Sequence, residues 1–209
     1  MLLSTAYFPP LSWLALAARD FRPGFSPAVI GLEACENYQK QSYRNRCYIL
    51  AGDGVQMLQV PVVHGDSWLI TDVRVDYSTP WVIRTQRALD TAYETSAYYE
   101  YYRDEVFALL DARPQTLWEL NLSTLRFLLR KTGIACDLSP TASFAREEAD
   151  DYRFAIHPKR EDTILADLGL DRPYYQVFRD RMGGFTPKLS CLDLLFNEGP
   201  DSILWLKKL

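Results

Sequence analysis

The polar segment Glu36–Cys47 constrains this 209-residue chain more than any other stretch. It reads Glu-Asn-Tyr-Gln-Lys-Gln-Ser-Tyr-Arg-Asn-Arg-Cys and lies between two apolar runs. Lys40, Arg44 and Arg46 are concentrated here, with no acidic residue after Glu36, although the chain as a whole is acidic. Neither a core strand nor a core helix needs this mixture, so the segment predicts a site for a polar or anionic ligand.

Composition excludes several classes of protein. The chain has 23 Lys and Arg against 27 Asp and Glu, a net charge of −4, which argues against nucleic-acid binding through phosphates. Its four cysteines show no Cys-x-x-Cys spacing and do not cluster with the two histidines, so we expect no metal site and a reduced, cytoplasmic protein. The apolar N-terminus lacks a positive region and contains Pro9-Pro10, which indicates neither a signal peptide nor a membrane span.

Apolar periodicity predicts a single α+β domain over residues 1–209. Strands are expected at 2–8, 28–32, 43–50, 55–63, 68–77 and 134–138. Helices are expected at 11–19, 80–93, 103–112, 114–132, 160–168, 173–181 and 189–196. Because Ala51-Gly-Asp-Gly54 is a hairpin turn signal, we expect a small, mostly antiparallel sheet in residues 1–77, packed against helices from residues 78–209. The polar run 145–151 is expected to be an exposed loop, and any domain boundary would fall there.

Two interpretations of the polar segment are open. In the functional one, Lys40, Arg44 and Arg46 surround an anionic group, which bidentate arginine suits. In the other, the segment is a solvent-exposed strand with its cations pointing outward. Alternation places Asn45 on the apolar face, where an unpaired amide costs about 1–3 kcal/mol, so it must bond backbone, water or ligand.

Two further polar residues lie on apolar helical faces. Asp193 is surrounded by apolar neighbours in Cys191–Phe196, so its carboxylate must be paired or protonated. It either holds an arginine of the site, acts as an acid or base, or forms a structural ion pair or cap. Asn121 shares a face with leucines, and a structural role is favoured for it.

Glycines and cysteines offer weaker signals. Gly183-Gly184 followed by Lys188 before a helix is compatible with an anion nest or with a plain loop. Cys35 or Cys47 could act as a nucleophile with His64 or His157 as its base, but a buried inert thiol is the commoner fate of a free cysteine.

Several of these residues carry a resemblance to the WbqC-like family of bacterial proteins. The lysine, the aromatic residue and the Asn-Arg pair that look most characteristic fall on Lys40, Tyr43, Asn45 and Arg46. The other anchors are Ser4–Pro10, Val60-Pro61, Asp76-Tyr77, Trp81, Gly184-Phe185 and Leu189–Gly199. The chain departs from the family pattern at Thr5-Ala6-Tyr7, Ala34-Cys35 and Arg84-Thr85.

The resemblance implies a gene found among surface-polysaccharide (O-antigen) and related biosynthetic genes. The leading hypothesis is a transferase, with acyl or aminoacyl transfer onto an amino sugar as one reaction that fits this setting. The rival hypotheses are a non-catalytic ligand-binding or assembly factor of the same pathway and a cysteine-dependent acyl transferase or peptidase.

The predicted site combines two sets of residues. The expected catalytic set has Asp193 as acid, base or arginine partner, with Asn45 and Tyr43 orienting the substrate. The substrate-binding set is Lys40, Arg44, Arg46, Gln39 and Lys188. The expected partner is a small anionic molecule, such as a sugar nucleotide or an acyl donor. The sequence specifies neither a cofactor nor an oligomeric state.

Overall fold

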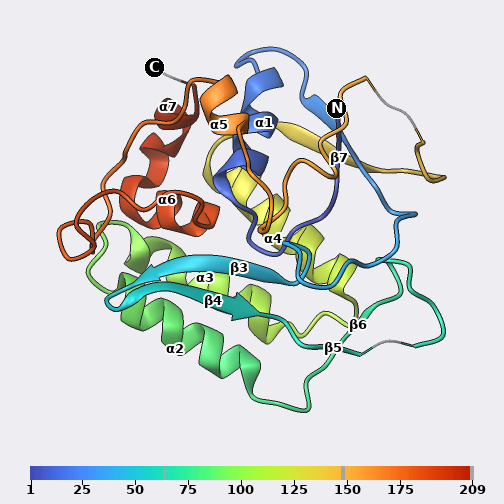
Figure 1. Ribbon diagram of the computed structural model, residues 1–209, viewed down its shortest axis with the longest axis horizontal. Coiled ribbons are helices and arrows are strands. Elements are labelled where there is room, and N and C mark those ends of the chain that lie inside the picture. Colours follow the sequence, from blue (N-terminus) through green and yellow to red (C-terminus); the bar gives the residue numbers. More distant parts are fainter. Residues whose placement is uncertain (64, 147–148, 208–209) are drawn as a thin grey trace.

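Figure 1 shows a computed structural model of the chain, which describes residues 1–63, 65–146 and 149–207. The helices are α1 (Leu11–Asp20), α2 (Trp81–Tyr93), α3 (Tyr99–Asp111), α4 (Leu117–Lys131), α5 (Ile164–Asp167), α6 (Cys191–Glu198), the 3-10 helix η1 (Gly199–Asp201) and α7 (Ser202–Lys207). The strands are β1 (Leu2–Leu3), β2 (Ala28–Leu32), β3 (Arg46–Ala51), β4 (Gly54–Gln59), β5 (Val62–Val63), β6 (Arg74–Val75) and β7 (Cys136–Pro140). Their buried apolar side chains form one cluster that extends from Leu3 to Leu206. Within the described ranges, no helix combines the length and the apolar character that crossing a membrane requires.

The three-stranded sheet is parallel, with the order β1-β2-β7. Leu2 lies opposite Gly31, and β2 pairs along its whole length with β7. Gly31 fits this approach because a Cβ there would lie 3.2 Å from the Leu2 side chain. A parallel bridge from Leu2 to Asp151 extends the pairing beyond β1.

The prediction of a mostly antiparallel sheet from the N-terminal third was therefore wrong. Parallel strands are joined by long crossovers, and here α1 lies between β1 and β2, while about half of the chain separates β2 from β7. Periodicity identifies strands but does not show which distant segments pair. The segment around Asp151, expected as an exposed loop or linker, instead lies against β1 where the structure describes it; residues 147–148 lie outside the described part.

The predicted hairpin is confirmed, because β3 and β4 pair antiparallel from Arg46↔Gln59 to Ala51↔Gly54. Figure 1 shows α2 running along one side of this hairpin. The strand expected over residues 68–77 is reduced to β6, which pairs with β5. The first half of the predicted strand bonds a loop instead. Tyr38 N–H donates to Trp68 O at 2.7 Å, and Ile70 N–H donates to Glu36 O at 3.0 Å.

Local sequence explains where the main helices begin and end. Residues Leu11 to Ala18 of α1 are all buried, as its nearly all-round apolar pattern predicts. At α4, Thr116 and Glu119 form a capping box, and Gly133 follows the helix with a φ of 70°. The helix expected over residues 173–181 does not form. Tyr174 and Gln176 instead direct their side chains onto Asp193, at 2.6 and 3.0 Å.

Candidate functional site

Polar side chains gather where the three parallel strands end. Ser4 follows β1, Glu33 and Glu36 follow β2, and Thr141 follows β7. The carboxyl ends of parallel strands meet at one edge of a sheet, and open α/β sheets bind their ligands outside that edge. We call this region the carboxyl edge.

Glu33 forms the first buried ion pair of the carboxyl edge. Its Oε2 accepts from Arg153 Nη1 at 2.6 Å and from Ala145 N–H at 3.1 Å. Its Oε1 accepts from the Thr141 hydroxyl at 2.6 Å and from Cys35 N–H at 3.0 Å. With four donors around it, this fully buried carboxylate is satisfied as a charged group.

Glu36 and Arg44 form the second buried pair. Arg44 Nε donates to Glu36 Oε1 at 2.8 Å, and its Nη2 pairs with Oε2 in a bidentate contact. The Ser4 hydroxyl joins this pair, because it donates to Glu36 at 3.0 Å and accepts from Arg44 at 2.8 Å. Arg44 was expected to bind substrate, but two of its nitrogens are engaged within the protein.

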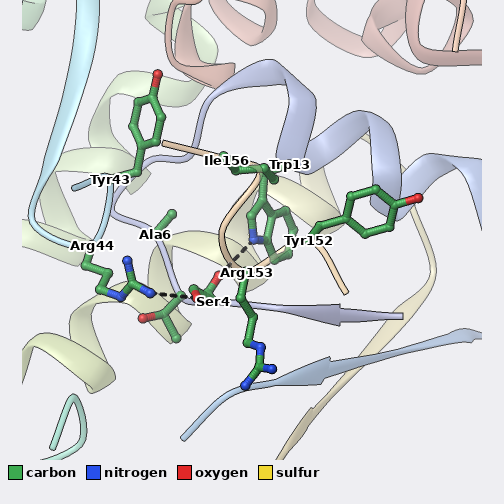
Figure 2. Close-up of a pocket in the computed structure, with 9 residues that line it drawn as sticks. Ser4, Ala6, Trp13, Tyr43, Arg44, Tyr152, Arg153 and Ile156 are labelled. Carbon is green, nitrogen blue, oxygen red and sulfur yellow. Dashed lines mark hydrogen bonds between the residues drawn. The ribbon is translucent and has the colours of Figure 1, made fainter. Parts of the chain in front are cut away.

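A narrow pocket of about 10 Å³ lies beside these two ion pairs. Its lining residues are Ser4, Thr5, Ala6, Trp13, Tyr43, Arg44, Tyr152, Arg153 and Ile156. In Figure 2, Arg44 points toward Ser4, and the Trp13 indole donates to the Ser4 carbonyl at 3.1 Å. A cavity of this size holds about one water molecule, so neither a carboxylate nor a phosphate fits inside it in this conformation.

Three cationic side chains outside the pocket lining lie near His157. They are Arg46, Lys159 and Arg160, and we call them the cationic rim. Their charges act together on His157, whose pKa is lowered by burial and then by Arg160, Arg44, Lys159 and Arg46. Lys159 contacts the side chain of Gln41, and Arg160 Nη1 donates to Phe154 O at 3.0 Å.

Arg46 is the rim residue whose charge and N–H donors are least satisfied by contacts within the protein. It forms no ion pair within the described part of the chain, and its Nε is buried without a hydrogen-bond partner there. A buried donor without an acceptor costs about 1–3 kcal/mol. A bound anion would supply that acceptor.

His157 is held in one orientation by its own loop. Its Nδ1 accepts from Lys159 N–H at 3.2 Å, which places the proton of the neutral ring on Nε2. Because its lowered pKa keeps the ring neutral at pH 7, His157 presents an N–H donor at Nε2. It is suited to hold an oxyanion or a carbonyl oxygen rather than to remove a proton.

Two of the buried amides, Asn45 and Asn121, bond the backbone around the polar segment. Asn45 Nδ2 donates to Val60 O at 3.0 Å, and Asn121 Nδ2 donates to Arg44 O at 2.9 Å. Asn121 also reaches the Thr5 hydroxyl at 3.2 Å. Both amides therefore position the loop that carries the cations.

The remaining members of the polar segment point in different directions. Tyr43 lines the pocket, and burial raises the pKa of its hydroxyl, which therefore stays protonated. The Lys40 ammonium lies 5.5 Å from the centre of the Trp68 ring and does not line the pocket. Gln39 is half-buried, and its carbonyl accepts from the Ser42 hydroxyl at 2.6 Å.

Asp193 lies in a buried cluster apart from the pocket lining. Its Oδ1 accepts from the Tyr93 hydroxyl at 2.8 Å, and its Oδ2 accepts from Tyr174 at 2.6 Å and Gln176 at 3.0 Å. Burial raises the pKa of the carboxyl group against these hydrogen bonds, which lower it. Asp193 is thus held by neutral donors rather than by an arginine, and we do not carry it forward as acid or base.

Lys188 lines a different, more apolar pocket together with Phe185 and Trp205. The predicted anion nest has no free donors at the start of α6. The first N–H groups there bond Pro9 O at 2.8 Å and the Ser190 hydroxyl at 3.2 Å.

The thiols offer little nucleophilic chemistry. Cys47 and Cys191 are fully buried, and burial raises the pKa of both. Cys35 is half-buried, and its backbone binds Glu33. His64 lies outside the described residues. Within the described ranges, no group of His, Cys, Asp and Glu side chains could hold a metal ion.

Sequence reasoning missed Ser4, Glu33, Thr141 and Arg153 as parts of the site. The usable signal was a polar residue directly after each of three short strands. It becomes meaningful only once these strands are known to be parallel and adjacent.

The WbqC-like protein family matches residues 29–165, a span that includes Glu33, Glu36, the cationic rim and Arg153. An "Uncharacterized protein Rv1507c" of Mycobacterium tuberculosis is 25% identical over 194 residues, which cover 81% of this chain and 84% of that protein. No solved structure matches the chain. Because the family match spans well over half of its length, the chain belongs to the WbqC-like protein family.

Proposed function

We propose that the protein is a transferase of surface-polysaccharide or related small-molecule biosynthesis, which binds a small anionic substrate at the carboxyl edge. The observation that carries the proposal is Arg46, a cation with a buried, unpartnered Nε beside further cations. An acyl donor or a sugar nucleotide has the negative charge that this arrangement would neutralise.

The ion-paired arginines and the cationic rim have different roles in the proposed binding. Arg44 and Arg153 are fixed by Glu36 and Glu33, so they shape the pocket before any ligand arrives. The pocket has room for about one water molecule, so the anionic ligand would bind against the cationic rim instead. Preorganised donors of this kind favour binding because little side-chain freedom is lost.

The proposed reaction is acyl or aminoacyl transfer onto an amino sugar. The sugar amine would form a bond to the acyl carbon, and the leaving group of the donor would depart with its electron pair. The amine proton would pass to that leaving group or to solvent. His157 would donate from Nε2 to the acyl oxygen, where negative charge develops.

A non-catalytic ligand-binding or assembly factor of the same pathway is the second candidate. It is favoured by one feature of His157, whose accepting nitrogen is already occupied by Lys159 N–H. With that nitrogen engaged, His157 is not poised as a general base.

The test is a thermal-shift screen with sugar nucleotides, acyl donors and amino sugars, followed by mass spectrometry of the products. We expect at least one anionic ligand to raise the melting temperature of the wild type, and Arg46→Ala to abolish that rise. Arg126→Ala, on the exposed face of α4, is the matched control and should respond like the wild type. A ligand-induced shift without a product supports the binding factor. If no panel member shifts the wild type, the anion-binding proposal fails.

A further inference from the structure

A second polar groove lies between α2 and the β3–β4 hairpin. Gln56 and Arg84 line two adjoining hollows there, so the hollows form one continuous depression, which we call the α2 groove. Arg87 and Arg181 line its wider end, and Trp81 lines its narrower end of about 250 Å³.

The α2 groove and the cationic rim share no lining residue. Arg46, Lys159 and Arg160 line neither of the two hollows that make up the groove. Gln59, the cross-strand partner of Arg46, lines the narrower end, so the two regions are neighbours on the hairpin.

The wider end of the groove carries an excess of positive charge. Arg84, Arg87 and Arg181 are exposed, and none of them forms an ion pair with any residue that the structure describes. Asp53 is the acidic side chain in the lining of this end. Three guanidinium groups around one hollow repel each other, and a multiply charged anion would relieve that repulsion.

The narrower end contains the beginning of α2, a helix of 13 residues. Its N-cap is Pro80, which provides no side-chain hydrogen bond, and the first turn has no acidic residue. The positive end of the helix dipole is thus uncompensated by the neighbouring sequence.

Trp81 provides an independent indication of a ligand at this end. Trp81 is only 4% exposed, and its ring stacks on Tyr77 with ring centres 5.7 Å apart. Within the described chain, its Nε1 finds no acceptor. Indole N–H groups usually find a partner when buried, so an oxygen-rich ligand would complete the contact.

We propose that the α2 groove binds a phosphate-bearing small molecule. One phosphate group sits at the start of α2 and accepts a hydrogen bond from Trp81 Nε1. Arg84, Arg87 and Arg181 neutralise the remaining negative charge, which a diphosphate or a phosphate monoester supplies. The site stands independently of the function proposed for the carboxyl edge.

The test is a calorimetric titration of the full chain with inorganic pyrophosphate and with inorganic phosphate. We expect the wild type to bind pyrophosphate with one-to-one stoichiometry and more weakly at high salt. Arg84→Ala and Trp81→Phe should each weaken binding by roughly tenfold, as expected for the loss of one charge-assisted hydrogen bond. Arg126→Ala, on the exposed face of α4 and outside both proposed sites, should bind as the wild type does.

Three outcomes would overturn the proposal. In the first, the wild type shows no pyrophosphate binding. In the second, Arg84→Ala binds as tightly as Arg126→Ala; this comparison uses exposed side chains and holds even if Trp81→Phe fails to fold. In the third, Arg46→Ala alone removes binding, which would assign the anion to the carboxyl edge instead.

Discussion

Arg153 donates from Nη1 to Glu33 Oε2 at 2.6 Å, and the two side chains are only 1% and 0% exposed. Glu33 directly follows β2, whereas Arg153 comes from the segment that pairs with β1. The ion pair therefore connects the end of the central strand to the segment on the far side of β1, beside the pocket. Asp151 accepts from the same guanidinium at 2.7 Å and completes the arrangement.

Breaking this pair should destabilise the protein strongly. Arg153→Met leaves the Glu33 carboxylate buried without its counter-charge, which costs about 3–5 kcal/mol. Arg19→Met removes an ion pair with Asp150 whose side chains are 28% and 40% exposed, and it should cost at most about 1 kcal/mol. Urea denaturation of both variants measures the difference. Equal losses would show that burial does not govern the strength of these pairs.

Thiol reactivity should follow burial. Iodoacetamide should modify Cys35 and Cys136 in the native protein, because both are half-buried. Cys136 should react more slowly than an ordinary exposed thiol, because burial raises its pKa to about 11. Cys47 and Cys191 should react only after unfolding. Peptide mapping checks this order, and native labelling of Cys47 would revive the cysteine-nucleophile hypothesis.

The sequence predicted local structure better than long-range pairing. The hairpin turn before Gly54, the buried helix that begins at Leu11 and the end of α4 near Gly133 all follow from short-range rules of turns and periodicity. The parallel sheet does not, because β2 and β7 pair although about half of the chain separates them in sequence. The antiparallel prediction failed at this point, where no local pattern specifies the partner.

In the candidate site too, local features were predictable from the sequence and long-range contacts were not. Cationic clustering in the polar segment was visible from sequence, and Arg46 keeps a buried nitrogen without an internal partner. That Arg44 is paired with Glu36 could not be read from alternation, since β3 begins only at Arg46. His157 was considered only as the base for a cysteine. His157 lies near the rim because of the path of its loop, and the sequence does not predict which part of the chain that loop packs against.

Asp193 should make stability depend on pH in an unusual direction. Its folded pKa is raised by burial, so above its ordinary value of 3.8 the folded state still holds a proton that the unfolded state has lost. Its contribution to stability is therefore present at low pH and is lost as the pH rises through the raised pKa. Asp193→Asn has no such titration, so the stability of the wild type relative to this variant should fall as the pH rises.

Denaturant titrations of the wild type and Asp193→Asn at several pH values measure this difference. Asp193→Ala provides the second comparison, because it leaves the hydroxyls of Tyr93 and Tyr174 without their acceptor. Each buried unsatisfied group costs about 1–3 kcal/mol, so this variant should be destabilised at every pH. A wild type that gains stability over Asp193→Asn on raising the pH would contradict the raised pKa.

His157 should titrate below its ordinary value of 6.5, because burial and the surrounding cations disfavour its charged form. In NMR titration we expect its midpoint to lie below 6.5 and to rise when Arg160 is replaced by alanine, since that removes the strongest neighbouring charge. Arg126→Ala is the control and should leave the midpoint unchanged. A wild-type midpoint above 6.5 would contradict the cationic environment.

The same lowered pKa has a consequence for stability. As the pH falls below 6.5, the unfolded state binds a proton that the folded state resists, so the folded state loses stability until the folded pKa is passed. His157→Gln lacks this titration and should lose less stability between neutral and mildly acidic pH. An anion bound beside the cationic rim would favour the charged imidazole and raise its pKa. A ligand from the transferase screen that binds there should therefore shift the His157 midpoint upward, whereas a ligand bound only in the α2 groove should not.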